Sequence, residues 1–423
     1  MKRIWKTAAA LAFSFPLTAA EFHIDPGRGS MENDGSREKP WSTLREVVDK
    51  DGLFTAGDRL VVHGGDHGAV LIRGRSNESP VTIVSADGET PVLRKLTIRE
   101  SENWVIDGVT VTPTDEGRRS RNTLVEVGGD HIVIENCRIF TTEDVSGWTL
   151  EDWNQKPCNG ISLGGDDCTA RGNTVRNINF GITASGGRAR VIGNVIENFA
   201  GDGMRGLGDF GVFEGNTVRN CYNVNDNHDD GFQSWSRTRD GVGKGVVKGI
   251  VLRGNTIINR TDPDQPFRGP LQGIGCFDGF YQDWLIENNV VVVDHWHGIT
   301  LMGARDCVIR NNTVIDIAPG KPGPTWIRID PHKNKQASSG CLVVNNLAAD
   351  FRVAPGNTRA HNVKPGDPDA CFVDPASFDF HLRPASPAID AGGGDSFPET
   401  DADGKPRVSG KAVDAGAYEF QSR

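Results

Sequence analysis

The densest group of titratable side chains lies in the stretch NDNHDDGFQSWS, from Asn225 to Ser236. Within five residues it holds three aspartates, Asp226, Asp229 and Asp230, and one imidazole, His228. Like charges this close raise the free energy of a fold unless a proton, a metal ion or a cation is shared between them. Because carboxyl groups and imidazole exchange protons readily, we expect this stretch to carry acid–base chemistry rather than to form only a polar turn.

A repeated pattern of short apolar strands, each ended by a Gly-Asn or Asn-Asn pair, indicates how these residues are positioned. The pattern reads TARGNTVRN, RVIGNVIEN, VFEGNTVRN, VLRGNTIIN, LIENNVVVV, VIRNNTVID and LVVNNLAAD, and its second pair member is Asn173, Asn194, Asn216, Asn255, Asn289, Asn312 or Asn346. The shortest spacings are 21, 22 and 23 residues. Such a period predicts a solenoid whose coils stack about 4.8 Å apart. We expect these asparagines to be structural, since asparagine tolerates left-handed turns and can hydrogen-bond from coil to coil.

A second row of motifs predicts one outer sheet of this solenoid. It reads NGISL, FGITA, DGMRG, DGFQS, QGIGC and HGITL, starting at Asn159, Phe180, Asp202, Asp230, Gln272 and His297. The residue after each glycine is apolar and should point inward, so the following residues should point outward: Ser162, Thr183, Arg205, Gln233, Gly275 and Thr300. Such a sheet can accept an extended chain across its strands; the alternative is that the glycines serve only to relieve turns.

These repeats resemble the right-handed parallel β-helix superfamily of pectate-lyase-like proteins, over nearly all of the chain that follows the first twenty residues. GDRLVVHGGDHGAVLIRGRSNESPVTIVSADGETPVL looks like the first coils of carbohydrate-active members, and DADGKPRVSGKAVDAGAYEF is similar to a closing segment of bacterial β-helix proteins. The resemblance implies an all-β fold, a right-handed parallel β-helix, for which we expect roughly ten coils.

We expect residues 21–423 to form a single domain with both ends of the solenoid covered, because stacked coils expose apolar surface at each end. About residues 21–60 should form the N-terminal cap. Within it, STLREVVDK predicts a short capping helix, with Thr43 and Glu46 as a capping box and Leu44, Val47 and Val48 on its buried side. About residues 375–423 should close the other end.

Three insertions interrupt the coils, between Arg138 and Thr169, between Asn220 and Lys248, and between Asn259 and Trp284. Long loops on a rigid scaffold commonly carry function, and here they would wall a groove over the outer sheet. Their aromatic residues can stack on sugar rings, although for any single one we expect it to cover the loop's own core: Trp148, Trp153, Trp235, Phe267 and Tyr281. The candidates for substrate binding are Gln233, Trp235, Arg268, Tyr281 and His297.

Stacking brings the acidic stretch beside residues that are distant in the sequence. Asp202 and Asp230 occupy equivalent positions in successive coils, so their Cα atoms should lie about one strand spacing apart. Arg205 projects from the coil of Asp202, and His297 lies in the same row, with His295 beside it. We therefore predict one catalytic site made of Asp202, Arg205, Asp226, His228, Asp229 and Asp230.

One reaction that suits this site is removal of the carbon-5 proton of a uronic acid. His228 would be the base, Asp226 or Asp229 would orient it, and Arg205 would neutralise the adjacent carboxylate. Expulsion of the 4-O group then gives a lyase, and reprotonation from the opposite face gives an epimerase. The segment DNHDD resembles the DPHD-type motif of mannuronan epimerases, which implies catalytic roles for Asp226 and His228, although Asn227 replaces the proline of that motif and Tyr222 is out of register with its aromatic residue.

Other readings stay open at the level of sequence. Asp202, Asp229 and Asp230, followed by His297-Gly298 and by Arg328 to Asp330, follow the order of polygalacturonase motifs, which implies an inverting glycoside hydrolase. The same three aspartates can bind Ca²⁺, which prefers grouped oxygen ligands and can neutralise substrate carboxylates. A non-catalytic polysaccharide-binding or surface β-helix protein is the remaining alternative.

The composition limits the partners and the compartment. The net charge of −10 argues against nucleic-acid or membrane-surface binding, but it allows a local basic patch for an acidic polysaccharide, and we expect a monomer. Residues 1–20 are typical of a secretory signal peptide, with Lys2, Arg3 and Lys6 before an apolar run and cleavage near Ala20, so we expect a secreted or periplasmic protein.

The eight cysteines contain no CxxC pair, so a zinc site is not expected. Cys168, Cys307 and Cys341 each lie five residues before a repeated asparagine, which predicts an interior position for all three. If the coils of Cys307 and Cys341 are adjacent, their spacing allows a disulfide, which an oxidising compartment permits.

Overall fold

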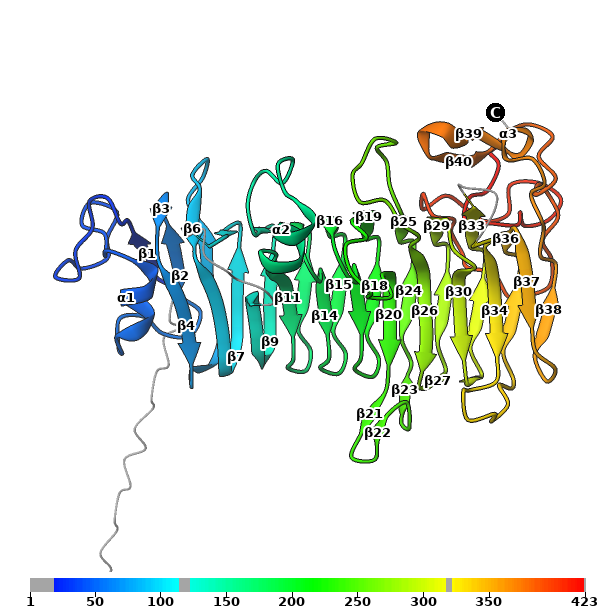
Figure 1. Cartoon of the computed structure of the whole chain (residues 1–423). Helices are drawn as coiled ribbons and strands as arrows, with labels where there is room; N and C mark the ends of the chain where they lie inside the picture. Colours follow the sequence, from blue (N-terminus) through cyan, green and yellow to red (C-terminus); the bar gives the residue numbers. More distant parts are fainter. Residues whose placement is uncertain (1–18, 114–121, 317–321, 422–423) are drawn as a thin grey trace, which may run out of the picture.

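The structure, a computed structural model, describes residues 19–113, 122–316 and 322–421. It is a right-handed parallel β-helix with three strand rows, so the fold predicted from the repeats is confirmed (Figure 1). Nearly all of the predicted signal peptide lies outside the described residues. No helix in the described part of the chain is long and apolar enough to cross a membrane.

The row that carries the candidate site, here called the site sheet, follows the predicted DG, FG and HG motifs. Its strands pair in parallel from coil to coil, and two of them, β7 and β9, continue into the next row. In order they are β4 (Ala69–Arg73), β7 (Lys95–Asp107), β9 (Thr123–Glu135), β11 (Asn159–Leu163), β14 (Ile182–Ala184), β17 (Met204–Gly206), β20 (Asp230–Trp235), β26 (Gln272–Asp278), β30 (His297–Met302), β34 (Trp326–Asp330) and β37 (Asp350–Val353).

A second row, the middle sheet, follows the site sheet within each coil. It consists of β1 (Glu21–Ile24), β2 (Arg59–Val62), β5 (Ser76–Ser85), the second parts of β7 and β9, β12 (Thr169–Arg171), β15 (Arg190–Ile192), β18 (Val212–Glu214), β24 (Val251–Arg253), β28 (Leu285–Glu287), β32 (Val308–Arg310), β35 (Leu342–Val344) and β38 (Thr358–Ala360).

The third row, the back sheet, completes each coil. It consists of β3 (Gly65–Asp66), β6 (Pro91–Leu93), β8 (Thr110–Val111), β10 (Arg138–Phe140), β13 (Thr174–Ile178), β16 (Val195–Phe199), β19 (Thr217–Cys221), β25 (Thr256–Ile258), β29 (Val290–Val293), β33 (Thr313–Asp316) and β36 (Leu347–Ala348). Three short strands extend the coils between the site and middle sheets: β23 (Val246–Lys248), β27 (Phe280–Gln282) and β31 (Ala304–Arg305).

The predicted direction of side chains in the site sheet is confirmed. The residues after the glycines are almost fully buried in the core and pair with one another from coil to coil: Ile161, Ile182, Met204, Phe232, Ile274 and Ile299. The next residues form a parallel outward row, which continues through Arg328 and Arg352. Because strand alternation has a period of two, this row lies on the outer face of the sheet.

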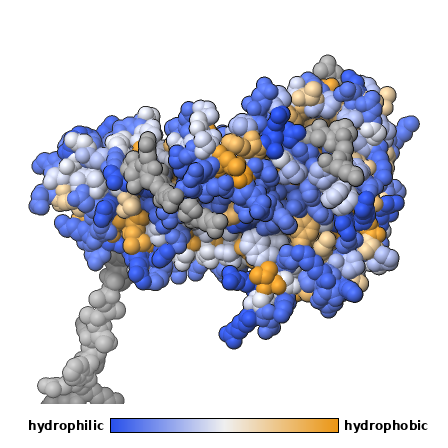
Figure 2. Space-filling model, viewed as in Figure 1, coloured by the Kyte–Doolittle hydropathy of each residue, from blue (hydrophilic) through white to orange (hydrophobic). Residues whose placement is uncertain are grey.

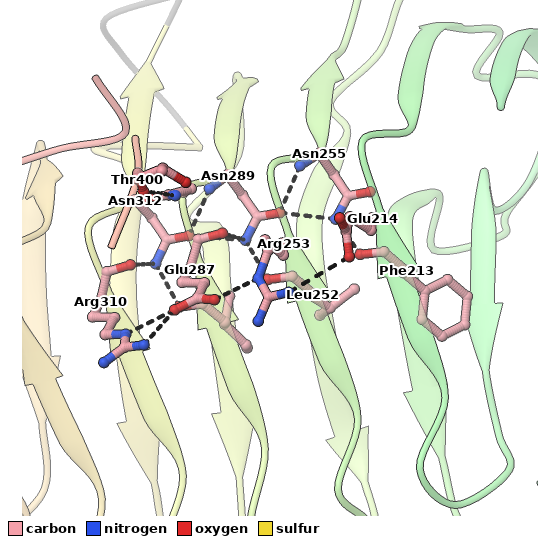
Figure 3. A network of polar contacts seen from close by, with 12 residues as sticks. Phe213, Glu214, Leu252, Arg253, Asn255, Glu287, Asn289, Arg310, Asn312 and Thr400 are labelled. Atoms are coloured by element: carbon pink, nitrogen blue, oxygen red, sulfur yellow. Dashed lines mark hydrogen bonds and ion pairs between the residues drawn. The ribbon is translucent and has the colours of Figure 1, made fainter. Parts of the chain in front are cut away.

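The predicted asparagine ladder stands between the middle and back sheets. Each side-chain Nδ2 donates to the Oδ1 of the next ladder asparagine at 2.9 Å, through Asn173, Asn194, Asn216, Asn255, Asn289, Asn312, Asn346 and Asn362. Figure 3 shows part of this ladder beside Glu287, a buried carboxylate between Arg253 and Arg310. The left-handed backbone belongs to the residue before each ladder asparagine, such as Gly172 or Asn288, and not to the ladder asparagine itself.

The predicted capping helix at the N-terminal end is present as α1 (Leu44–Asp49). The Thr43 hydroxyl accepts a hydrogen bond from the Glu46 backbone N–H, and Leu44, Val47 and Val48 are buried. The Glu46 carboxylate accepts from the hydroxyls of Ser42 and Thr43, which ties it to the residues that begin the helix.

The C-terminal tail packs along the side of the last coils. Its elements are α3 (Pro368–Cys371), β39 (Phe372–Asp374), η1 (Pro375–Ser377) and β40 (Asp379–Leu382). Its apolar side chains share a core with outward residues of the back sheet, among them Val292, Ile315 and Leu347. Further along, buried Arg407 donates to Asn288 Oδ1 and to the Ala417 carbonyl, so the tail is fastened to a solenoid turn as well as to itself.

All eight cysteines are buried and carry free thiols. Cys168, Cys307 and Cys341 are in the core, as predicted. Cys307 and Cys341 lie in adjacent coils, since Val308 pairs with Leu342, and their side chains are within hydrogen-bonding distance of each other.

Candidate functional site

The insertions lie at two edges of the site sheet. The first insertion carries a helix that was not predicted from the sequence, α2 (Leu150–Gln155). This insertion lies at the edge where the back sheet connects to the site sheet. Residues 222–229 and 260–271 lie at the same edge. The second predicted insertion is divided by β20: its later part forms a hairpin, β21 (Arg237–Thr238) and β22 (Gly241–Val242), at the opposite edge (Figure 1). The outer face of the site sheet therefore has projections along both edges.

Asp202 and Asp230 are neighbours, as the coil spacing predicts. The Asp230 backbone N–H donates to Asp202 Oδ1 at 3.2 Å, and the Arg205 Nε donates to Asp202 Oδ2 at 2.5 Å. Both aspartates are buried, and the side chain of Arg205 is 18% exposed. Asp202 is thus held by a guanidinium on one side and by the next coil on the other.

The carboxyl group of Asp230 lies on the outer face of the sheet, at the foot of the outward row. Its Oδ2 accepts from Gln233 Nε2 at 2.7 Å, and its Oδ1 has no hydrogen-bond partner among the described residues. A Cβ built on Gly275, which belongs to the outward row, would be 2.0 Å from this Oδ1. Only a glycine at position 275 leaves room for the carboxyl group where it stands.

The environments of the two carboxyl groups separate their protonation states. Burial and the charge of Asp202 raise the pKa of Asp230 well above its usual range. Burial also raises the pKa of Asp202, but the Arg205 guanidinium opposes that rise. Since only Asp202 has a direct ion pair, Asp230 is the member of the pair that holds its proton more strongly. A proton donor and a carboxylate side by side form an acid–base pair.

Asp229 forms its hydrogen bonds outside this pair. Asn223 Nδ2 donates to its Oδ2 at 3.0 Å, and the thiol of Cys221 lies beside it. Burial and the charge of Asp202 raise the pKa of Asp229 to about 7. The prediction that Asp229 orients His228 is not matched by any hydrogen bond in the described residues.

His228 and Asp226 are exposed on the loop that precedes β20. His228 is near enough to Asp202, His295 and His297 for its positive charge to contribute to lowering the pKa of each. Asp226 lines a separate cavity of about 320 Å³ with Trp153, Phe180 and others, and it makes no hydrogen bond to His228 in the described structure. His228 therefore reaches the site without the carboxylate partner predicted for it.

Two aromatic rings hold the Arg205 guanidinium in place. Its Cζ lies 3.4 Å from the centroid of Phe180 and 5.3 Å from that of Trp235. In the motif row, Phe180 occupies the position equivalent to Asp202. Its stacking on Arg205 could not be predicted from the sequence, because that contact depends on the path of the arginine side chain. The guanidinium is positioned by a cation–π contact and an ion pair together.

His297 lies further along the row and is neutral. Its Nδ1 is 2.9 Å from the Thr300 hydroxyl and 3.3 Å from the indole Nε1 of Trp326. Burial, with the positive charges of His295, Arg328 and His228, lowers the pKa of His297 to about 3. Phe277 packs edge-on against its ring at 4.8 Å, which connects His297 to the surroundings of Asp230. His297 can accept or donate a hydrogen bond, but it is a poor proton acceptor.

Of the predicted substrate-binding residues, the structure contradicts Tyr281. Tyr281 is fully buried and its hydroxyl donates to the Ser234 carbonyl, so it cannot stack on a sugar. Trp148, Trp153 and Phe267 pack in a small core with Tyr222 and Val224, which is the role expected for single loop aromatics. Arg268 is exposed on the third insertion, where its Nη1 donates to the Pro263 carbonyl. Gln233 and Trp235 remain half-buried on the outer face.

The predicted calcium ligands do not converge on one point. Among the described residues, no three His, Cys, Asp or Glu side chains converge as they would around a metal. Asp202 is engaged by Arg205, and Asp229 turns toward Asn223, so the three aspartates do not fit a ready-made calcium site.

Comparison with known proteins agrees with the fold. A family model described as a right-handed β-helix region matches residues 159–348. The solved complex of XylC with xylose superposes with a TM-score of 0.52 at 11% identity, covering 79% of this chain and 76% of that one. The superposition on the pectate lyase Pel9A has a TM-score of 0.46 at 16% identity, and it covers 95% of this chain and 96% of the Pel9A chain. A rhamnogalacturonan lyase gives 0.45 at 13% identity, covering 82% and 88%. No curated protein matches the chain.

Proposed function

Because the chain is a right-handed parallel β-helix with a carboxyl pair on the outer floor of its site sheet, we propose that it is a carbohydrate-active enzyme that cleaves an acidic polysaccharide. The observation that carries the proposal is the pair itself: Asp230, whose pKa is raised by burial and by the charge of Asp202, lies beside Asp202, which the Arg205 guanidinium holds. A fold gains no stability from burying two carboxyl groups together, whereas acid–base catalysis uses groups with separated pKa values.

The reaction we favour is β-elimination on a uronic acid residue. The Arg205 guanidinium, fixed over Phe180, neutralises the substrate carboxylate and so makes the carbon-5 proton more acidic. His228 removes that proton, the carbon 4–oxygen bond breaks, and a carbon 4–5 double bond forms. Asp230 gives its proton to the departing oxygen, which leaves as a neutral hydroxyl. All three groups surround one stretch of the site sheet.

Cationic side chains along the outer face support an acidic substrate. Arg328 and Arg352 continue the outward row beyond Arg205, and the Cζ of Arg352 lies 4.0 Å from the centroid of Trp326. Each of these arginines pairs with an aspartate, Asp202, Asp330 or Asp350, so the row offers guanidinium donors to a substrate carboxylate rather than an excess of positive charge.

A second candidate is inverting hydrolysis of the glycosidic bond, favoured by the same separation of protonation states. In that reaction Asp230 would protonate the leaving oxygen and an ionised aspartate would activate water. The epimerase expectation is less well supported, because the predicted Asp226–His228 contact is not seen.

A product assay on pectate, alginate and neutral glycans tests the proposal. Elimination produces ultraviolet absorbance from the new double bond, and hydrolysis produces reducing ends without it. An altered proton spectrum of an uncleaved polymer would indicate epimerisation. Binding to a polymer without any of these products would contradict the enzyme proposal, and assays with and without EDTA would test the calcium expectation.

His228→Ala should lower the rate of elimination by at least about 100-fold, the usual contribution of a general base. The thermal transition should stay unchanged because the His228 side chain is exposed. Asn227→Ala, its exposed neighbour on the same loop, is the matched control and should retain activity. Full activity in His228→Ala would remove this residue as the base and leave Asp230 to be tested by Asp230→Asn.

A further inference from the structure

A second cavity lies beside the carboxyl pair, at the edge of the site sheet where the strands end. It has a volume of about 310 Å³ and is lined by Gln233, Ser234, Trp235, Val242, Phe277 and Asp278. Gln233 connects it directly to the reaction centre, since the same side chain donates to Asp230 Oδ2.

A β-bulge creates the aromatic walls of this cavity. Ser234 pairs with Cys276, but Trp235 pairs with Asp278, so Phe277 is an extra residue on β26. Bulges commonly redirect side chains beside active sites. Here the bulge leaves Trp235 and Phe277 on the same outer face without being directly opposite each other, and the cavity lies between them.

The β21–β22 hairpin supplies the third wall. Ser236 fastens it to the end of β26, because its N–H donates to the Asp278 carbonyl and its hydroxyl accepts from the Gly245 N–H. Val242, at the tip strand, lines the cavity although its side chain is 57% exposed. Figure 2 shows an apolar spot on this hairpin, at the bottom of the view, within a hydrophilic surface. An apolar side chain left open at the wall of a cavity gains free energy when a ligand covers it.

The charge of the hairpin is opposite to that of the whole chain. Residues 236–248 contain Arg237, Arg239, Lys244 and Lys248 against Asp240 alone, whereas the protein carries a net charge of −10. The Arg205 guanidinium does not line the cavity, but it lies 5.3 Å from the centroid of Trp235, which does. Aromatic faces with cations around them suit a sugar ring that bears a negative charge.

We propose that this cavity is a sugar subsite for an anionic polysaccharide: Trp235, Phe277 and Val242 cover the apolar face of one sugar residue next to the bond that Asp230 protonates, and the hairpin cations attract its acidic neighbours. The inference rests on the proposed function and adds to it the direction of the bound chain. The polymer passes over the carboxyl pair toward the ends of β20 and β26 and leaves along the hairpin.

Affinity electrophoresis in gels that contain polygalacturonate, alginate or a neutral glucan tests the subsite, with Asp230→Asn as the parent so that no polymer is cleaved. We expect an acidic polymer to retard the parent and the neutral glucan to leave it unretarded. Trp235→Ala and, separately, Val242→Ser should weaken retention about tenfold. Because Val242 is exposed, Val242→Ser should fold normally, so a loss of retention in this variant would not be due to misfolding. Val373→Ser, another exposed valine at 47%, is the matched control and should bind like the parent.

Equal retention of the parent and both variants would overturn the subsite, as would retention by the neutral glucan alone or by no polymer. Different results would contradict the proposed function and the subsite. If the variants lose retention while the unmodified protein produces no new ends or double bonds, the subsite stands and the enzyme proposal falls. If the unmodified protein cleaves a polymer and both substitutions leave KM unchanged, the enzyme proposal stands and the subsite falls.

Discussion

At the scale of single residues, Asp230 combines three features that together suit a proton donor. It is fully buried, one of its oxygens has no hydrogen-bond partner in the described structure, and a charged carboxylate lies next to it. Burying an unpaired carboxylate costs far more than burying a neutral acid, so the proton stays until a substrate atom approaches. Exclusion of water, rather than a strong hydrogen bond, therefore keeps the proton on Asp230.

Gly275→Ala should disable the site without a change in any polar group. The added methyl would fall 2.0 Å from Asp230 Oδ1, so the carboxyl group must move from its position over the sheet. We expect turnover to fall by about 100-fold, as a misplaced catalytic group generally causes. Gly128→Ala, in the same sheet, has its nearest contact at 3.8 Å and should retain activity. Turnover of Gly275→Ala equal to that of the control would show that the carboxyl position does not matter.

The protonation of Asp229 should make stability depend on pH. Its pKa is raised from 3.8 to about 7, so between these values the folded chain holds a proton that the unfolded chain has released. The free energy of unfolding should therefore decrease as pH rises from about 4 to about 7, by on the order of 4 kcal/mol at most, with Asp230 acting in the same direction. Thermal melts across this range measure the effect. Asp229→Asn should flatten the dependence, and identical slopes in both proteins would contradict it.

At the scale of elements, the ladder links each coil to the next through buried side-chain amides. Asn255 accepts from the Asn216 backbone and side chain and donates to Phe213 and Asn289. Asn255→Ala removes the oxygen that accepts from the Asn216 backbone N–H and from Asn216 Nδ2 in a dry interior, so we expect a loss of about 3 kcal/mol in chemical denaturation. Asn362→Ala, at the half-exposed last position of the ladder, should cost about 1 kcal/mol. Equal losses would mean that burial does not set the cost.

The strand rows could be predicted from the sequence because every coil repeats the same pattern of turn and core residues. Because of that regularity, the sequence alone predicts that Asp202, Arg205 and Asp230 lie on one face. The loops have no such period, so the helix α2 and the division of the second insertion by β20 were missed. For the same reason the direction of Asp229, which depends on Asn223 in the loop before β20, could not be foreseen.

The fine arrangement of the site also depends on features that no motif encodes. The contact between Gly275 and Asp230 joins residues on neighbouring strands, and the glycine by itself only suggests a turn or a bulge. The bulge at Phe277 shifts the pairing by one residue, which a pattern of period two cannot indicate. Tyr281 was misjudged because a tyrosine within an insertion gives no sign of whether its ring faces solvent or core.

At the scale of the whole molecule, the acidic chain must attract an acidic polymer through local charge. The arginines of the outward row act at short range, whereas the net charge of −10 acts at distances that about 0.1 M salt already screens. Polymer retention by Asp230→Asn should therefore fall about tenfold from low to high salt, as contacts with arginine weaken. Arg352→Gln should reduce this salt dependence, and Lys411→Gln, an exposed cation on the tail, should not. Retention that rises with salt would show that overall repulsion governs binding.

The asparagine ladder has a polarity with a consequence for biosynthesis. Every ladder asparagine before the last, Asn362, offers its backbone N–H and its Nδ2 to a single oxygen that belongs to the following coil. Each coil that emerges from the ribosome thus brings the acceptor for two donors that its predecessor leaves open. The solenoid can close in the order in which it is translated, one turn at a time, without waiting for the C-terminus.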